Sequence, residues 1–467
     1  MRELLTKSGL RFQRTLAGVA VCVLLAPVVG RGQQAAAETT NSAAVTSGVQ
    51  ASYDASLRAE YDYRSQGSAT AQDLFGYWSA AGHDIENGLL DFYMSGMMHR
   101  DLATDPLFNG LQNAPGVNEN RVLQAYLDVN DKPDDMQLRL GRQYIDVADY
   151  LTIDGAQAIL FENSDLGGRL YFGAPVSYYS PQTTHVAFGG SVVGTPWEGN
   201  RTRLTYSQYG DDNGNTSDRN YFADMRQEII TGVTARGQVS ILNDMFRMGS
   251  LDFSCFTPDG DTDLFFGGSR WGSFDANSLA YSPFLQQLGT LEPYSFYYAR
   301  LSQAITRTLS LSPGVSYRVA DSGDSQTDFS NRSYGDYDLT LSYDPNRVFG
   351  SSLSVQYWDV SGGDSFVGLS GEITYRDPKV WEVSAGCEYA AYSYNYYTDI
   401  SYIGNGGQTT VGPDGTSETT PYAMTYFVRG KWNVTKSLAL RAQCDLENDK
   451  SVSALGVWAR ASAEVKF

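Results

Sequence analysis

Histidine, lysine and cysteine are scarce in this sequence. Its 467 residues include 3 His, 7 Lys and 4 Cys, and Cys22 lies in an apolar stretch near the N-terminus. The other three, Cys255, Cys387 and Cys444, are an odd number, which argues against a disulfide framework. Because no Cys-x-x-Cys-His motif is present, the chain attaches no c-type haem by itself. We expect the protein to carry no cofactor.

Positive charge is also in short supply. The sequence has 34 Lys and Arg residues against 53 Asp and Glu, a net charge of -19, which does not suit a nucleic-acid binder with a basic face. A hydrophobic content of 42% does not fit a disordered chain either. Aromatic residues are plentiful, with 32 Tyr, 21 Phe and 7 Trp, and there are 47 Gly. This composition is typical of a large all-β protein with many short turns.

The N-terminus has the pattern of an export signal. Four basic residues precede an uncharged, mainly apolar run over 15–29, and three alanines at 35–37 offer a cleavage site. These features predict a secretory signal peptide over 1–37 and Sec-type export, followed by a short periplasmic segment over 38–52. A transmembrane anchor is the alternative, but the run is shorter than the ~20 residues that a spanning helix needs.

Alternation of apolar and polar residues recurs along the rest of the chain. It is clear in the segments 53–64, 308–319, 336–343 and 422–432. Successive side chains of a strand point to opposite faces, so each segment has one apolar and one polar face. Runs of roughly 10 residues suit strands that cross a membrane, whereas strands of soluble sandwiches usually have about five or six. The pattern predicts a transmembrane β-barrel with a wet lumen.

The C-terminal segment carries the sharpest signal. Phe467 ends a run in which every second residue back to Leu455 is apolar. A terminal strand of this kind, ending in Phe, resembles the recognition signature of Gram-negative outer-membrane barrels. The resemblance implies that the barrel assembly machinery reads Phe467 as an assembly signal.

Turns and loops predict the topology. Short polar turns such as 344–347, 376–379 and 433–436 alternate with longer connections such as 398–421. Outer-membrane barrels have short periplasmic turns and longer external loops. We predict an all-β fold, a single transmembrane antiparallel β-barrel of about 20–22 strands over 53–467. Candidate strands lie near residues 53, 71, 88, 121, 135, 155, 166, 183, 200, 222, 236, 248, 262, 293, 308, 335, 350, 366, 381, 422, 437 and 453, and those near 71, 236 and 248 are the weakest.

A short motif narrows the resemblance. The stretch 138–143, Leu-Arg-Leu-Gly-Arg-Gln, and 153–156, Ile-Asp-Gly-Ala, are similar to a Gly-Arg-Gln … Asp-Gly pattern. That pattern occurs in alginate-export-like barrels and in the porin components of porin–cytochrome conduits. The match puts Arg139 on the lumen phase of a strand and Arg142 near the strand end. More broadly, the whole mature chain resembles a porin-like Gram-negative outer-membrane barrel, which implies insertion into outer-membrane lipid.

Three functions are compatible with such a barrel. The first is a channel for passive passage of small hydrophilic solutes, with charged side chains across a water-filled pore. The second is the sheath of a porin–cytochrome electron-transfer conduit, with a multihaem cytochrome filling the lumen. The third is polysaccharide export. For the channel, the predicted pore-lining residues are Arg58, Glu60, Asp91, Asp128, Arg139, Arg169, Arg203, Arg318, Glu372, Arg429 and Arg441.

The sequence gives little support to an enzymatic function. No Gly-x-Ser-x-Gly elbow, His-Glu-x-x-His or P-loop occurs in the sequence. A phospholipase-type barrel would need a Ser/His pair at the membrane rim, but His83, His99 and His185 are far apart along the chain. We therefore predict that the protein is not an enzyme.

The sequence offers one weak metal candidate and two segments that could occupy the lumen. Asp259, Asp261 and Asp263 alternate like oxygen ligands of Ca²⁺, but their loop is short and lacks a later Glu, which favours a solvated turn. The long loops 99–120 and 272–292 could fold inward. We predict that apolar residues of the second loop pack on the inner wall or on a partner.

Overall fold

The computed structural model describes most of the predicted barrel, and the predicted signal peptide lies outside the described residues. The described ranges are 51–66, 69–102, 119–131, 133–146, 150–161, 164–176, 185–211, 217–272, 293–321, 332–361, 364–377, 379–397, 416–419, 422–449 and 455–467. Both long loops that were predicted to fold inward lie mostly outside them. In the described part of the chain, no helix is both long and apolar enough to cross a membrane.

The first half of the chain forms long strands joined by short connections. Their bounds are β1 Ser52–Gln66, β2 Ala69–Asp84, β3 Leu90–Asp101, β4 Asn120–Asp131, β5 Met136–Asp146, β6 Tyr150–Leu160, β7 Leu166–Pro175, β8 His185–Gly194, β9 Asn200–Asp211, β10 Ser217–Ile230, β11 Val233–Leu242 and β12 Met245–Phe256. A single helical turn, α2 (Ile85–Gly88), joins β2 to β3.

The second half continues in the same way. Its strands are β13 Thr262–Trp271, β14 Tyr294–Ala304, β15 Leu309–Ala320, β16 Tyr334–Tyr343, β17 Phe349–Val360, β18 Asp364–Asp377, β19 Trp381–Tyr397, β20 Thr416–Thr419, β21 Tyr422–Asn433, β22 Leu438–Asp449 and β23 Gly456–Lys466. The short β20 pairs with the far end of β19, while β21 pairs with the rest of β19.

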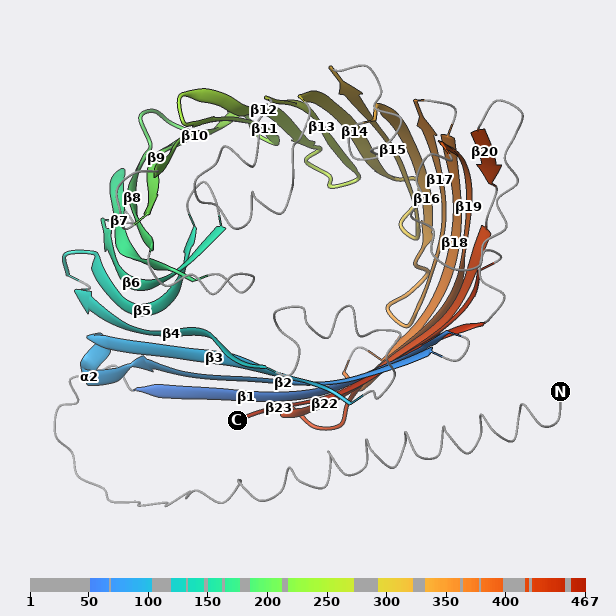
Figure 1. Cartoon of the computed structure of the whole chain (residues 1–467), viewed down its shortest axis with the longest axis horizontal. Coiled ribbons are helices and arrows are strands. Elements are labelled where there is room, and N and C mark those ends of the chain that lie inside the picture. Colours follow the sequence, from blue (N-terminus) through green and yellow to red (C-terminus); the bar gives the residue numbers. More distant parts are fainter. Residues whose placement is uncertain are drawn as a thin grey trace.

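The strands close into a barrel (Figure 1). With β20 left out, each strand pairs antiparallel with the next, and β1 pairs with β23 over Ser56–Gln66. Setting aside β20, the wall contains 22 of the 23 strands in the sheet. Within the described residues, each of the 22 wall strands pairs on both sides, so the wall has no free edge, as a membrane-spanning sheet requires. The prediction of an antiparallel barrel of about 20–22 strands is therefore confirmed.

Each of the 22 predicted strands corresponds to an observed one. The three weakest predictions, near 71, 236 and 248, are β2, β11 and β12. The largest differences are at β6 and β10, which begin five residues before the predicted positions of 155 and 222. Polar turns predicted at 344–347 and 433–436 lie between β16 and β17 and between β21 and β22.

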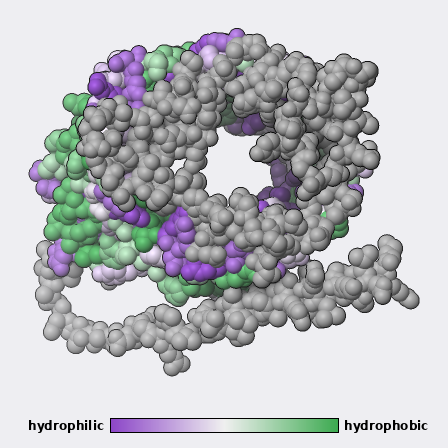
Figure 2. All heavy atoms as spheres, viewed as in Figure 1, coloured by the Kyte–Doolittle hydropathy of each residue, from purple (hydrophilic) through white to green (hydrophobic). Residues whose placement is uncertain are grey.

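The two faces of the wall differ in polarity. Leu57, Leu170, Phe172 and other large apolar side chains are exposed on the outer face. On the opposite face of β1, Glu60 and Asp62 are buried among polar partners. In Figure 2 the outer wall is largely green and hydrophilic residues appear on its inner side. An apolar outer belt over a polar interior is the arrangement of a barrel in lipid.

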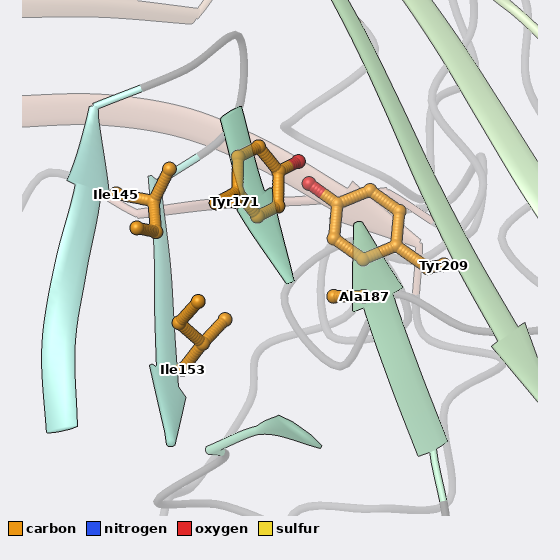
Figure 3. Packing of buried hydrophobic residues seen from close by; sticks show 5 residues of the cluster. All are labelled: Ile145, Ile153, Tyr171, Ala187 and Tyr209. Carbon is orange, nitrogen blue, oxygen red and sulfur yellow. The ribbon is translucent and has the colours of Figure 1, made fainter. Parts of the chain in front are cut away.

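One part of the inner face is apolar. A buried cluster lies on consecutive strands from β5 to β9 and consists of Ile145, Ile153, Tyr171, Ala187 and Tyr209. Figure 3 shows the two tyrosine hydroxyls pointing toward each other. Strand alternation places these residues on the same phase as polar neighbours such as Gln143 and Gln157. The inner wall is therefore not uniformly hydrophilic.

A row of glycines crosses the wall in the same region. Gly141 pairs with Gly155, and Gly155 pairs with Gly173. A Cβ on Gly155 would lie 2.1 Å from the carbonyl oxygen of Phe172, and Gly141 has a φ of +124°. Glycine permits this close approach where the wall turns between β4 and β7 (Figure 1). Close backbone packing therefore explains why glycine occupies both glycine positions, 141 and 155, of the Gly-Arg-Gln … Asp-Gly pattern.

Candidate functional site: a charged lumen

All eleven predicted pore-lining residues lie on the inner face of the wall. The cross-strand registers place them on the phase opposite to the exposed apolar side chains. They come from β1, β3, β4, β5, β7, β9, β15, β18, β21 and β22. That they line a conducting pore stays a prediction.

Asp128 and Arg139 form a closely matched pair across β4 and β5. The Arg139 Nε and Nη2 atoms donate to the two Asp128 carboxylate oxygens at 2.7 and 2.9 Å. The guanidinium also lies over the Tyr126 ring, 4.0 Å from its centroid. Because a bidentate pair of this kind neutralises both charges, it stabilises the wall and contributes little net charge to the lumen.

A second charged group lies where the first and last strands meet. Arg460 of β23 contacts Glu60 at 3.3 Å and Asp62 at 3.0 Å, both on β1. Trp458 Nε1 donates to Asp62 at 2.5 Å, and Arg58 forms an ion pair with Glu60. These contacts link the two strands that close the barrel.

Other predicted residues form pairs that are more exposed to water than Asp128 and Arg139. Arg429 and Glu372 are 3.9 Å apart on β21 and β18, with β19 between them. Arg441 Nη2 donates to Glu464 at 2.9 Å. Half-exposed pairs with these separations are individually worth little to stability, because water screens them.

Two predicted residues have partners other than an opposite charge. The Arg318 guanidinium lies 4.2 Å from the centroid of the Tyr294 ring. Asp91 accepts hydrogen bonds from Asn130 Nδ2 at 2.7 Å and from the backbone N–H of Asp84 at 2.6 Å. These contacts fix the positions of both side chains on the inner face.

Arg169 and Arg203 converge on a cavity in the wall between β7 and β14. The cavity has a volume of about 510 Å³ and holds five arginines against two aspartates. Its lining consists of Arg169, Ser191, Val193, Arg201, Arg203, Asp224, Arg226, Thr234, Arg236, Asp252, Phe253, Ser254, Phe265 and Tyr298. An excess of positive charge is unexpected in a chain whose net charge is -19. We call this cavity the arginine site.

Three of these arginines lie side by side. Arg226 of β10 is directly opposite Arg201 of β9 and directly opposite Arg236 of β11. Opposite side chains on neighbouring strands have Cβ atoms about 4.5–5.5 Å apart, and like charges in this arrangement destabilise a sheet. Repulsion between the three arginines therefore destabilises this part of the sheet, and an anion bound between the side chains would offset that repulsion.

The two aspartates of the site are already engaged. Asp224 accepts from Arg236 Nε at 2.8 Å and Nη2 at 3.1 Å, and Arg203 lies 3.7 Å away. Asp252 accepts from the Tyr298 hydroxyl at 2.9 Å and from Ser250 at 3.2 Å. Neither carboxylate forms an ion pair with Arg201 or Arg226 in the part of the chain that the structure describes.

A second basic cluster lies at the end of the barrel that holds the short turns. Four lysines, every lysine among the described residues, line one cavity of about 540 Å³. They are accompanied by Arg441 and by one carboxylate, Glu464, which contacts Lys466 at 3.3 Å. We call this group the lysine cluster; its lysines are Lys379, Lys431, Lys436 and Lys466.

The sequence predictions named two members of the arginine site and missed the rest. Arg201, Arg226 and Arg236 lie within ten residues of predicted strand starts and near short turns, so a signal was present in the sequence. Their mutual opposition depends on the register of β9, β10 and β11, which alternation alone does not provide.

The described side chains of the histidine candidates lie beside separate partners. His99 Nε2 lies 2.8 Å from Asp73, and its ring stacks on Phe75 at 4.4 Å between centroids. His83 is 3.8 Å from Asp54, and the side chain of His185 lies outside the described set. These contacts give His99 and His83 separate local partners.

The three aspartates of the calcium candidate lie in and beside the turn between β12 and β13. Asp259 accepts from the Thr257 hydroxyl at 2.5 Å and from the backbone N–H of Asp261 at 3.2 Å. The Thr257 hydrogen bond lowers the pKa of the Asp259 carboxyl. Among the described residues, no three His, Cys, Asp or Glu side chains are grouped to hold a metal ion. The local hydrogen bonds fit a solvated turn.

A closed sheet with an apolar outer face and a charged inner face defines the class: a membrane-spanning β-barrel with a hydrophilic lumen. No protein-family model matches the chain, and no curated protein matches it in sequence. Solved structures do resemble it. Pseudomonas aeruginosa OpdQ is 10% identical with a TM-score of 0.40, covering 90% of this chain and 99% of that one.

Two further structures show a similar degree of likeness. P. aeruginosa OccK2 (OpdF), solved in complex with glucuronate, is 12% identical with a TM-score of 0.43 and coverages of 89% and 98%. The translocation pore of the P pilus usher PapC is 10% identical with a TM-score of 0.46 and coverages of 89% and 99%. At these values the function has to be argued from the residues of this chain.

Proposed function

We propose that the protein is an outer-membrane channel for passive passage of small hydrophilic solutes. The observation that carries the proposal is the charged inner face of a closed 22-strand wall. A barrel interior lined by ionisable side chains holds water, and barrel diameter grows with strand number. The eleven inner-face residues would contribute the transverse field that sorts polar solutes.

The cellular setting belongs to the same proposal. The apolar outer belt supports insertion into lipid, and the predicted signal peptide supports Sec-type export to the periplasm. In Gram-negative bacteria this combination leads to the outer membrane, with the barrel assembly machinery as a partner. The activity proposed is passage without chemical change.

Planar-bilayer recording tests the channel directly. Purified full-length protein should insert in discrete steps and show steady conductance in potassium chloride. A heat-denatured sample of the same preparation serves as the control and should be silent. Correctly folded protein that inserts into vesicles but conducts no ions would overturn the channel proposal.

The same preparation tests the sheath hypothesis. If a multihaem cytochrome fills the lumen in the cell, mild extraction should yield a complex with haem absorbance. Haem-free protein with steady conductance supports the channel. A stoichiometric haem complex that is silent until the partner is removed would support the sheath.

A further inference from the structure

We infer that the arginine site binds small dianions, solutes that carry two carboxylates or a phosphate. The inference rests on the proposed channel function, because such solutes would reach the site through the lumen. It names the class of solute that the channel selects. Its basis is the set of side chains on β7 to β14, not the overall charge of the protein.

The first argument is charge. Five arginines and two aspartates line the cavity, so positive side chains outnumber carboxylates in its lining. Glu228, the next inner-face residue on β10, does not line the cavity. The excess is local, because the chain as a whole carries -19. A bound dianion would neutralise most of it.

The second argument is the opposition of Arg201, Arg226 and Arg236. Their Cα atoms are paired across three adjacent strands, so the three side chains leave the inner face of the wall side by side. Within the described residues, Arg201 and Arg226 form no ion pair, and both are exposed to the lumen side. Guanidinium groups are planar forks that bind carboxylate or phosphate oxygens through two parallel hydrogen bonds. Two such forks at neighbouring strand positions can hold both ends of a short dianion.

The third argument is the rest of the lining. Ser191, Thr234 and Ser254 bring hydroxyl groups, and Phe265 brings an apolar surface, to the same cavity. Hydroxyls can hydrogen-bond to a polar solute, and an aromatic ring can cover its carbon atoms. A volume of about 510 Å³ is within the usual range of small-molecule sites. The site therefore fits a compact organic acid or sugar phosphate.

Titration calorimetry on detergent-solubilised full-length protein tests binding without requiring conductance. Succinate and inorganic phosphate are the probes, and uncharged succinamide and cationic 1,4-diaminobutane are the comparison ligands. We expect saturable binding of one or both anions and of neither comparison ligand. Succinate without phosphate would indicate carboxylates as the natural ligand, and the reverse would indicate phosphates. Absence of binding by both anions would overturn the inference even if the channel conducts.

A charge-matched pair of variants locates the binding. R201Q/R226Q removes two charges from the arginine site, while K431Q/K436Q removes two charges from the lysine cluster. Because the two guanidinium groups would supply charge-assisted hydrogen bonds to the anion, R201Q/R226Q should weaken anion binding by at least roughly tenfold. K431Q/K436Q should bind like wild type. Equal losses in both variants would show a general charge effect and contradict the assigned site.

Bilayer recording then separates this inference from the channel proposal. Succinate should reduce wild-type conductance in a concentration-dependent way and should have a weaker effect on R201Q/R226Q. Unboiled gel migration checks that each variant is folded. A conducting channel that binds neither anion keeps the proposed function and rejects the dianion site. A protein that conducts no ions but still binds succinate rejects the channel function and keeps the dianion site.

Discussion

At the scale of single residues, Arg142 and Asp154 differ from the other described charges of the motif region because they face outward. Arg142 lies on the phase of Leu140 and Tyr144, whose side chains are exposed on the outer face. Its Nε and Nη2 atoms donate to the Asp154 carboxylate, both at 2.7 Å, and Nη1 donates to the Val122 carbonyl at 2.9 Å. Mutual pairing lowers the cost of placing two charges toward lipid.

Removing one partner should therefore be worse than removing both. Asp154→Leu removes the carboxylate that neutralises Arg142 on the outer face, where Arg costs about 2–4 kcal/mol near the bilayer midplane and less toward the interface. We expect the unfolding free energy to fall toward that value for Asp154→Leu, and to fall less for the double variant R142L/D154L. Urea unfolding in phospholipid vesicles measures both. Equal losses for the single and double variants would show that the pair is not shielded from water.

At the scale of elements, the last strand has two roles. Its inner face carries Arg460, which contacts Glu60 and Asp62 of β1 and so links the first strand to the last. Its backbone continues the pairing to the chain end, where the Phe467 N–H donates to the Ala55 carbonyl at 2.9 Å. The Phe467 side chain is 63% exposed on the outer side of this seam. An exposed apolar side chain at that position is available for recognition before the barrel closes.

Phe467→Asp tests the assembly signal. The substitution places a charge at the lipid interface and removes the aromatic group that the assembly machinery is predicted to read. We expect assembled protein in the outer-membrane fraction to fall sharply relative to wild type. Leu455→Asp is a matched control, because Leu455 is 56% exposed and precedes the same strand at its opposite end. Similar losses in both variants would indicate a general intolerance of charge, not a terminal signal.

At the scale of the whole molecule, the barrel distributes charge unevenly. Positive and negative side chains are equal in number in the Asp128–Arg139 pair and in the group Arg58, Glu60, Asp62 and Arg460 where β1 meets β23. The arginine site and the lysine cluster each have more positive than negative side chains. Both excesses lie toward the end of the barrel that carries the short turns. By the rule that short turns are periplasmic, an anion crossing the channel would meet them on the inner side of the membrane.

The apolar outer belt has a consequence for the behaviour of the whole protein. Large side chains such as Leu57, Leu170 and Phe172 are exposed around the wall, and water does not solvate them well. Extraction should therefore require detergent, and unboiled protein should migrate differently from boiled protein on a gel, because the closed sheet resists unfolding by the detergent. Recovery of a soluble monomer after mild lysis would contradict a membrane-spanning barrel.

The sequence alone predicted the fold class, a strand count of about 20–22 and inner-face positions for eleven charged residues. This was possible because alternation of side chains is a local property of an extended chain, and each of the 22 wall strands has ten or more residues in which to show it. The four-residue β20 lies within the connection predicted over 398–421 and was not predicted as a strand. The sequence also did not predict that Arg142 and Asp154 face outward. Arg139 and Glu60 could be placed on the inner phase from their immediate neighbours. The same reasoning located the weak strands β11 and β12, whose pairing then proved regular over most of their length.

Tertiary structure alone decided which charges meet. Arg201, Arg226 and Arg236 are up to 35 residues apart in the sequence, and a shift of one residue in β10 would turn Arg226 toward lipid. The register that sets them side by side, and that leaves Asp224 bound to Arg236, depends on backbone pairing across the wall. Alternation assigns a side chain to a face. The partners it meets on that face depend on which strands pair and at which residue.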